Sequence, residues 1–261
     1  MKPLERLYER EGLPSSPLPE ALAAAYGGGL GLRRPGVYAN FVASVDGVVA
    51  LASQEESGHL ISGDDEPDRF IMGLLRASVD AVLIGAGTFR KAQGQLWHAE
   101  AIYPAAQDLF ATLRLQLNLR PQPLLVIVTD IGDIDPAQPA LQDCLILTTP
   151  RGECRLRSSL CSGAQLAVFD APSISGRSML DVLSARDLHV VLVEGGPTLV
   201  GQLLGEGLID ELFLTTSPRL FGRFPADERK ALVEGIDLGG RAMQLLSLRR
   251  HGSHLYSRYS L

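Results

Sequence analysis

Short, uninterrupted apolar runs are the feature that most constrains how this chain can fold. They are rich in Val, Ile and Leu, and they comprise Val37–Ser44, Asp80–Ile84, Leu124–Thr129, Cys144–Thr148, Gln165–Phe169, His189–Val193 and Leu208–Ser217. A strand with one solvated face alternates apolar and polar residues, whereas a strand buried on both faces does not. The runs therefore predict strands of a mostly parallel sheet that is covered on both sides.

Segments with helical spacing of apolar residues lie between these runs. The predicted helices are Asp65–Ser78, Ala105–Leu117, Ser178–Ala185 and Thr198–Glu206. The tail from Ala242 to Leu261 alternates instead, like two antiparallel strands around a Gly turn. We therefore predict an α/β fold in which helices flank both faces of a central, mostly parallel sheet and the C-terminal strands are antiparallel.

The first 36 residues differ in composition from the rest of the chain. A charged segment around residues 3–11 predicts a short helix, and it is followed by Pro14, Pro17 and Pro19 and then by a cluster of glycines. Such a high density of Pro and Gly residues is typical of a linker. We therefore predict an N-terminal arm over residues 1–36 and one larger domain over residues 37–261. The arm is expected to pack against this domain or against a partner subunit.

Charge and hydropathy exclude several functions. Lys plus Arg is 24 against 30 Asp plus Glu, a net charge of −6, whereas nucleic-acid binding depends on clustered Lys and Arg. No apolar run reaches the length of a membrane span, and no apolar segment follows the charged N-terminus as in a secretory signal. These features predict a cytoplasmic protein that binds neither nucleic acid nor membrane.

Cysteine and histidine patterns exclude two further kinds of site. The chain has 3 Cys and 5 His, with no CxxC pair, no HExxH motif and no His pair four residues apart. Neither a disulfide scaffold nor a metal site is expected from these spacings.

Two glycine-rich turns follow predicted strands and open into helices. Gly85-Ala86-Gly87-Thr88 follows one strand, and Glu194-Gly195-Gly196-Pro197-Thr198 follows another. Glycine allows a close backbone approach, and a helix N-terminus presents unpaired N–H groups to an anion such as a pyrophosphate. The turns predict a dinucleotide site, although tight turns with Thr198 as an ordinary helix cap remain an alternative. Thr129, which ends a further strand, is another candidate contact.

Four charged or titratable residues are candidates for the chemistry, each with a structural alternative. Glu194 ends a buried strand, where a carboxylate either acts on substrate or pins a neighbouring loop. Asp46 belongs to an Asp-Gly turn that the residue itself favours. Arg76 is either a solvated cation at a helix end or a phosphate ligand. His59 either lines a pocket or lies in a surface loop.

Several blocks, in order along the chain, resemble one family. They are Val42-Ala43-Ser44-Val45-Asp46-Gly47, Leu74-Leu75-Arg76-Ala77, Asp80-Ala81-Val82-Leu83-Ile84-Gly85-Ala86-Gly87-Thr88, Val193-Glu194-Gly195-Gly196-Pro197-Thr198-Leu199, Leu208-Ile209-Asp210-Glu211-Leu212 and Ser217-Pro218-Arg219-Leu220-Phe221-Gly222. The match covers about residues 37–261 and resembles the reductase domain of the bifunctional riboflavin-biosynthesis deaminase–reductase, in the dihydrofolate-reductase-like superfamily. The deaminase half has no counterpart, since its Pro-Cys-x-x-Cys signature is missing.

The resemblance implies a cofactor, a partner and site residues. It implies NADPH as hydride donor and a homodimer. Thr88 and the segment from Gly196 to Gln202, which includes Pro197, Thr198 and Leu199, would contact NADPH. Glu194 and Arg76 would face the substrate, with Arg76 near its phosphate, while Asp46 and the backbone around Ala43 would border the nicotinamide.

One loop departs from the family pattern. An Asp-Asp-Pro segment and a later Arg usually follow the Gly-x-Gly-Thr block, whereas residues 89–97 carry no carboxylate and offer Arg90 and Lys91 instead. We predict an NADPH-dependent reductase, with 5-amino-6-(5-phosphoribosylamino)uracil as its expected substrate and hydride transfer to C1′ of the opened ribosylamino group. The altered loop keeps open a reductase of another heterocycle, such as a dihydropterin. A dinucleotide-binding module without catalysis is the third alternative.

Overall fold

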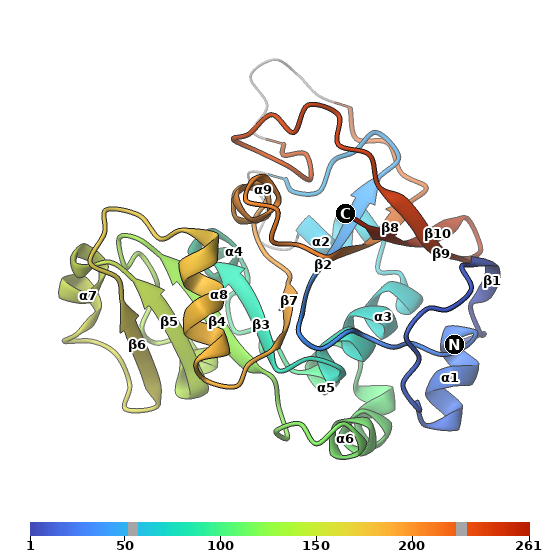
Figure 1. The fold of residues 1–261 in the computed structure, drawn as a ribbon, viewed down its shortest axis with the longest axis horizontal. Helices are drawn as coiled ribbons and strands as arrows, with labels where there is room; N and C mark the ends of the chain where they lie inside the picture. The colour runs from blue at the N-terminus through green and yellow to red at the C-terminus, as the bar shows by residue number, and fades with distance from the viewer. Residues whose placement is uncertain (52–56, 223–228) are drawn as a thin grey trace.

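The computed structural model describes residues 1–51, 57–222 and 229–261. Its described strands form one sheet in the order β1-β9-β10-β8-β2-β7-β3-β4-β5-β6 (Figure 1). The strands are β1 (Glu5–Glu9), β2 (Gly36–Ser44), β3 (Ala81–Gly85), β4 (Leu124–Thr129), β5 (Cys144–Thr148), β6 (Ala164–Val168), β7 (Val190–Val193), β8 (Glu211–Ser217), β9 (Gln244–His251) and β10 (His254–Ser260).

Strand directions confirm the predicted sheet. All neighbouring pairs from β8 through β2, β7, β3, β4 and β5 to β6 are parallel. The C-terminal strands β9 and β10 and the N-terminal β1 add antiparallel pairs beyond β8. The carboxyl ends of β2, β7 and β3 consequently meet at one edge, which is where ligands bind in open α/β sheets.

Helices cover both faces, as the continuous apolar runs predict. They are α1 (Glu20–Tyr26), α2 (Ser57–Ser62), α3 (Glu66–Ala77), α4 (Ala86–Lys91), α5 (Ala99–Ile102), α6 (Gln107–Gln116), α7 (Pro150–Leu156), α8 (Gly176–Ser184) and α9 (Pro197–Gly205). Successive residues of β3 divide between two cores: Leu83 packs with α8 and α9, while Val82 and Ile84 pack with α3, α4 and α6. Among the described residues, no helix has both the length and the apolarity needed to cross a membrane.

The predicted helix around residues 3–11 is wrong, because this segment forms β1. It pairs antiparallel with β9 at the edge of the sheet. Ion pairs across the two strands favour this arrangement: Arg250 Nη2 lies 2.6 Å from Glu5 Oε2, and Arg249 Nη2 lies 2.6 Å from Glu9 Oε2. The arginines of β9 lie far from β1 in the sequence, so the charged residues of β1, taken alone, are equally compatible with a helix. The division into an arm and a domain at residue 37 stays a prediction, although β1 joins the same sheet.

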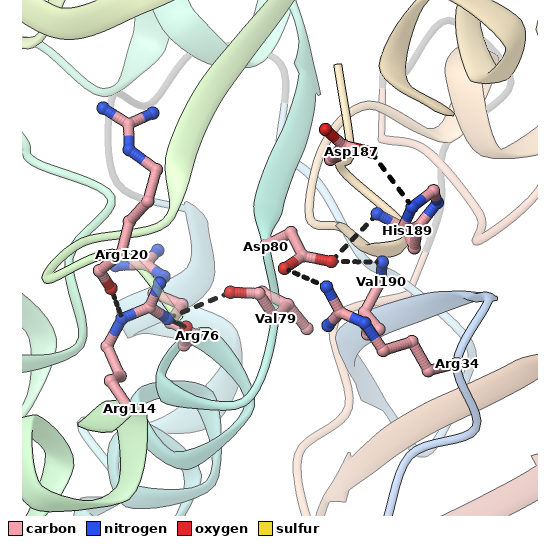
Figure 2. A network of polar contacts seen from close by, with 9 residues as sticks. All are labelled: Arg34, Arg76, Val79, Asp80, Arg114, Arg120, Asp187, His189 and Val190. Carbon is pink, nitrogen blue, oxygen red and sulfur yellow. Dashed lines mark hydrogen bonds and ion pairs between the residues drawn. The ribbon is translucent and has the colours of Figure 1, made fainter. Parts of the chain in front are cut away.

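A buried carboxylate aligns β3 beside β7 at their amino ends (Figure 2). Asp80 Oδ1 accepts from Arg34 Nη2 at 2.9 Å. Its Oδ2 accepts from the backbone N–H groups of His189 at 2.9 Å and Val190 at 2.7 Å. Asp80 directly precedes β3 and its side chain bonds to the start of β7, so it helps to fix the register of the two strands. The two glycine-rich turns then come side by side at the opposite edge.

Candidate active site

A cavity of about 230 Å³ opens where β2, β7 and β3 end. Helix α3 forms one wall, α4 and the segment after it form another, and the turn between β7 and α9 closes the base. The polar and turn residues that line it include Asn40, His59, Asp68, Arg69, Arg76, Thr88, Lys91, Gln95, Glu194, Gly196 and Pro197. The structure therefore brings together six predicted site residues, His59, Arg76, Thr88, Glu194, Gly196 and Pro197.

Arg76 and Glu194 form a buried ion pair at the base of this cavity. Arg76 Nη2 lies 2.7 Å from Glu194 Oε2, and Arg76 Nε donates to both carboxylate oxygens at 3.1 Å. The two side chains are only 6% and 5% exposed. The alternative of a solvated cation at the helix end is therefore wrong for Arg76, because its charge is matched inside the protein.

The same arginine holds the segment that departs from the family pattern. Arg76 Nη1 donates to the backbone carbonyls of Leu96 at 3.4 Å and His98 at 3.3 Å. Glu194 is itself held in place, since its backbone N–H donates to the carbonyl of Leu83 on β3 at 3.1 Å. The pair thus links β7, α3 and the segment after α4, and it gives the cavity a rigid base.

Glycine is required where the two turns approach each other. A Cβ on Gly195 would lie 2.9 Å from the Ile84 Cβ and 3.0 Å from the Thr88 hydroxyl. Gly196 has φ +67°, a left-handed conformation that favours glycine. Gly85 meets no atom within 4 Å where its Cβ would be, and Gly87 meets only the end of the Arg90 side chain at 4.0 Å. The backbone of the first turn therefore remains open to a ligand.

The alternative reading of Thr198 as an ordinary helix cap is also wrong. Helix α9 begins at Pro197, its capping residue is Gly196, and no side chain bonds to the N–H groups at this end. Thr198 lies inside the helix and is exposed. The first free N–H groups, which belong to Thr198 and Leu199, are consequently available to an anion.

Asp68 is a cavity residue that the sequence analysis missed. It lies in the first turn of α3, is 7% exposed, and faces the cavity that contains Glu194. Burial raises its pKa from 3.8 to about 6, and the nearby charges of Asp65 and Glu194 act in the same direction. The acidic first turn of α3 is visible in the sequence, but an acid at that position is ordinarily solvated and favoured by the helix dipole. Nothing in the local pattern distinguishes the buried Asp68 from its neighbours.

Three cationic or titratable side chains line the outer part of the cavity. Lys91 Nζ donates to the Leu51 carbonyl at 3.0 Å, and His59 Nδ1 lies 2.9 Å from Asp64 Oδ1. Arg69 lines this cavity and also an adjoining one bounded by Gln95 and Tyr103. Within the described residues, the Arg69 side chain makes no ion pair or hydrogen bond, so Arg69 offers a guanidinium to an anionic group at this point.

The predicted substrate residue Arg90 lies on the other side of α4, outside the cavity lining. Its Nη1 donates to the Asp133 carbonyl at 2.8 Å and lies 3.4 Å from the Asp133 carboxylate. Lys91, the next residue, is the one that lines the cavity. The sequence shows the two cations together but not which of them faces inward on so short a helix.

Asp46 also lies outside the cavity lining, where it holds a loop. Its carboxylate accepts from the Ser44 hydroxyl at 2.6 Å, from the Gly222 N–H at 2.6 Å and from the Phe221 N–H at 3.2 Å. The bond from Ser44, followed by those from the two backbone groups, lowers its pKa to about 2. Asp46 is therefore a hydrogen-bond acceptor that joins the β2 turn to the segment after β8, and its predicted catalytic role gains no support from this geometry.

Three predicted cofactor contacts are buried in the framework around the site. Thr129 is buried at the end of β4, and its hydroxyl accepts from the Gly132 N–H at 3.0 Å. The side chain of Leu199 packs in the core under α9, and Ala43 is buried on β2, next to the cavity residue Val42. Their side chains are thus committed to the fold, which leaves mainly backbone groups for contact with a ligand.

Comparison with known proteins identifies similar chains. A family model described as the RibD C-terminal domain matches residues 35–256. A 2,5-diamino-6-ribosylamino-4(3H)-pyrimidinone 5′-phosphate reductase from Archaeoglobus fulgidus is 26% identical over 193 residues, which cover 72% of this chain and 83% of that protein. The riboflavin biosynthesis protein RibD from Chlamydia pneumoniae is 29% identical over 199 residues, 73% of this chain but only 47% of RibD. This chain therefore spans about half the length of that RibD.

A solved structure shows the same fold. A pyrimidine reductase-like protein from Corynebacterium diphtheriae superposes with a TM-score of 0.70 at 23% identity, and the match covers 93% of this chain and 94% of that one. The similarity extends over nearly the whole of both chains, so the antiparallel strands at the sheet edge belong to the shared fold together with the parallel part.

Proposed function

This chain belongs to the RibD C-terminal domain family, and from that premise we propose that it is an NADPH-dependent reductase of a phosphoribosylamino-pyrimidine. The reductase from Archaeoglobus fulgidus acts on a 2-amino-pyrimidinone of this kind, and the corresponding uracil is the substrate expected from the sequence. The observation that carries the proposal is that uncapped glycine turns, a buried ion pair and cationic side chains line one cavity.

The residues at the glycine turns fit a nicotinamide dinucleotide. The α9 N-terminus has no side-chain cap, and the β3–α4 turn is open where side chains would otherwise stand. We propose that Gly85, Gly87 and Thr88 hold the cofactor together with the segment Gly195–Leu199, with backbone contacts from Ala43 and Thr129. When bound, the reduced nicotinamide supplies a hydride to the substrate carbon.

The cationic part of the cavity fits the phosphate of the substrate. Arg76 is neutralised by Glu194, so we assign the 5′-phosphate to Arg69, with Lys91 and His59 nearby. Guanidinium groups bind phosphate through paired, charge-assisted hydrogen bonds. The phosphate would then lie toward the adjoining cavity that Arg69 shares, and the heterocycle would lie deeper, between α3 and β2.

Glu194 and Arg76 act in this proposal mainly by positioning. Both carboxylate oxygens of Glu194 are bonded to Arg76, and Arg76 fixes the Leu96 and His98 carbonyls. Hydride transfer depends strongly on such rigidity, because a small displacement of donor from acceptor costs much of the rate. Full turnover by Glu194→Gln would contradict any part for this carboxylate in the reaction.

Oxidation of NADPH, followed by its absorbance, tests the proposal with four acceptors. They are the ribosylamino-uracil and the 2-amino-pyrimidinone, each with and without the 5′-phosphate, and a dihydropterin is assayed beside them as the alternative acceptor. We expect turnover of a phosphorylated compound, with weaker turnover of its dephosphorylated form. Turnover of a dihydropterin instead would move the substrate to another heterocycle, and cofactor binding without any turnover would favour a non-catalytic module. The homodimer and the cytoplasmic location stay predictions, and analytical ultracentrifugation tests the dimer.

A further inference from the structure

Reduction of a ribosylamino-pyrimidine needs a proton as well as a hydride. The open form of the substrate has a C1′=N double bond, and its reduction leaves an N–H that the nicotinamide does not supply. Resting on the proposed function, we propose that Asp68 is the catalytic acid that gives this proton to the substrate nitrogen. This assignment goes beyond positioning, because it places one side chain of α3 in contact with a reacting atom.

The start of α3 positions Asp68 to act as this acid. Its backbone N–H donates to Asp65 Oδ2 at 3.0 Å, and this bond caps the helix. The Asp68 side chain is buried, lines the cavity and shares that cavity with Glu194 from the β7–α9 turn. A carboxyl group in this wall meets a ligand away from bulk water, where a proton passes directly between donor and acceptor.

The other titratable groups of the cavity are committed elsewhere. Both oxygens of Glu194 accept from Arg76. His59 bonds to Asp64 at the outer part of the cavity, and Lys91 donates to the Leu51 carbonyl. Arg69 is a permanent cation at neutral pH. Among the described residues that line the cavity, Asp68 is the carboxyl that is not in an ion pair.

The surroundings of Asp68 favour its protonated form. Burial and the negative charges of Asp65 and Glu194 raise its pKa, whereas a hydrogen bond from Thr215 on β8 and the charge of His254 on β10 lower it. Asp65 also accepts from the Tyr256 hydroxyl at 2.5 Å and lies 3.5 Å from His254 Nδ1. The balance leaves the pKa at about 6, in the range where a general acid is effective near neutral pH.

The proposed step balances in atoms and charge. The C1′=N π electrons move to nitrogen as the hydride bonds to C1′. The O–H bond of Asp68 breaks, and its proton forms the new N–H bond. Asp68 is left as a carboxylate, the cofactor is left oxidised, and one proton from solvent restores the acid before the next turnover.

Asp68→Asn tests this step, with Asp68→Glu as the conservative variant and Asp108→Asn as the control. Asp108 is an exposed acid in the first turn of α6 and lines neither cavity, so its substitution removes the same charge outside the site. We expect Asp68→Asn to lower kcat by about 100-fold or more, with KM and the affinity for the reduced product unchanged by calorimetry. Asp68→Glu recovers part of kcat, and Asp108→Asn matches the wild type.

The pH dependence gives a second, independent readout. The wild-type kcat should fall as pH rises through the pKa of Asp68, and the kcat of Asp68→Asn should not. A carboxyl carbon resonance that titrates near pH 6, measured by NMR without cofactor, should be present in the wild type and absent from Asp68→Asn.

Two results would overturn the assignment while the proposed function stands. They are an unchanged kcat in Asp68→Asn, and a raised KM at constant kcat, which is the signature of a binding group. Should Asp68→Asn not fold, the wild-type profile decides, and a kcat that is flat between about pH 5 and 8 refutes the acid. Failure of the wild type itself to reduce any of the pyrimidines overturns the proposed function, and the assignment with it.

Discussion

Replacement of Asp68 by Asn should make the protein more stable at neutral pH. The carboxyl of Asp68 is buried and faces the charges of Asp65 and Glu194, so ionising it is unfavourable in the folded protein. Asparagine has nearly the same shape and no charge, and it retains an oxygen that can accept from Thr215. The substitution therefore removes the cost of the charge while leaving the packing of α3 in place.

The magnitude follows from the pKa. Folding raises it from 3.8 to about 6, and each tenfold change in proton affinity corresponds to about 1.4 kcal/mol. Because the folded pKa is the higher one, the unfolded chain loses this proton first as pH rises. The stabilisation from the protonated form is thus complete below about pH 4, declines up to about pH 6, and is absent above it. At pH 7.5 and above, Asp68→Asn should exceed the wild type by about 3 kcal/mol in free energy of unfolding.

Urea denaturation at several pH values measures this difference. Trp97 is the one tryptophan of the chain and is buried beside the cavity, so its fluorescence reports unfolding. We expect the gap between Asp68→Asn and wild type to be near zero at about pH 4 and to open as the pH rises through 6, while Asp108→Asn tracks the wild type throughout. A variant that is less stable than the wild type at pH 7.5 and above, or a gap that does not depend on pH, would refute the reasoning.

Three further predictions concern the cavity and its glycine turn. Glu194→Gln leaves Arg76 buried without a counter-charge and should lower the free energy of unfolding by about 3 kcal/mol. In the same urea assay, the double variant that also carries Arg76→Met should recover part of this loss. Gly195→Ala brings a Cβ within 2.9 Å of Ile84 and should cost about 1–3 kcal/mol while weakening NADPH binding measured by calorimetry. Arg69→Ala should raise KM for the phosphorylated substrate about tenfold, with KM for the dephosphorylated compound unchanged in the same kinetic assay.

Each of these predictions has a result that contradicts it. Equal stability of Glu194→Gln and the wild type would mean that Arg76 reaches water or another partner. Gly207→Ala is a contrasting control for the glycine turn, since Gly207 has a left-handed φ of +66° and nothing within 4 Å of its Cβ position, whereas Gly195 has no left-handed φ and its Cβ would meet Ile84. A Gly195→Ala variant as stable as the wild type would mean that the turn accommodates the added Cβ. An Arg69→Ala variant whose KM rises equally for both substrates would place the phosphate elsewhere.

The fold was predictable because the strands that build it are buried on both faces. The runs at β3, β4, β5 and β7 consist of residues that pack alternately into the two cores. Successive positions must therefore be apolar, and the strand appears in the sequence as an unbroken apolar run. The edge strand β1 has no such requirement. Its charged residues bond to Arg249 and Arg250, more than two hundred positions along the chain, so its pairing leaves no local pattern to detect.

The site was predictable at its turns and less so at its side chains. The glycines at 195 and 196 show in the sequence because a close approach and a left-handed φ both exclude other residues. The pairing of Arg76 with Glu194 joins residues 118 positions apart, and burial alone separates Asp68 from the solvated acids beside it. Which of Arg90 and Lys91 faces the cavity depends on how the short helix α4 is rotated about its axis, which no spacing in the sequence determines.

The ion pair and Asp68 have complementary electrostatic effects. Arg76 neutralises most of the charge of Glu194, yet Glu194 still raises the pKa of Asp68. An uncharged residue at position 194 would remove this contribution and leave Asp68 more readily ionised. Burial, the largest cause, therefore keeps Asp68 near the pKa at which it can both give a proton and regain one at neutral pH, and Glu194 adds a smaller effect in the same direction.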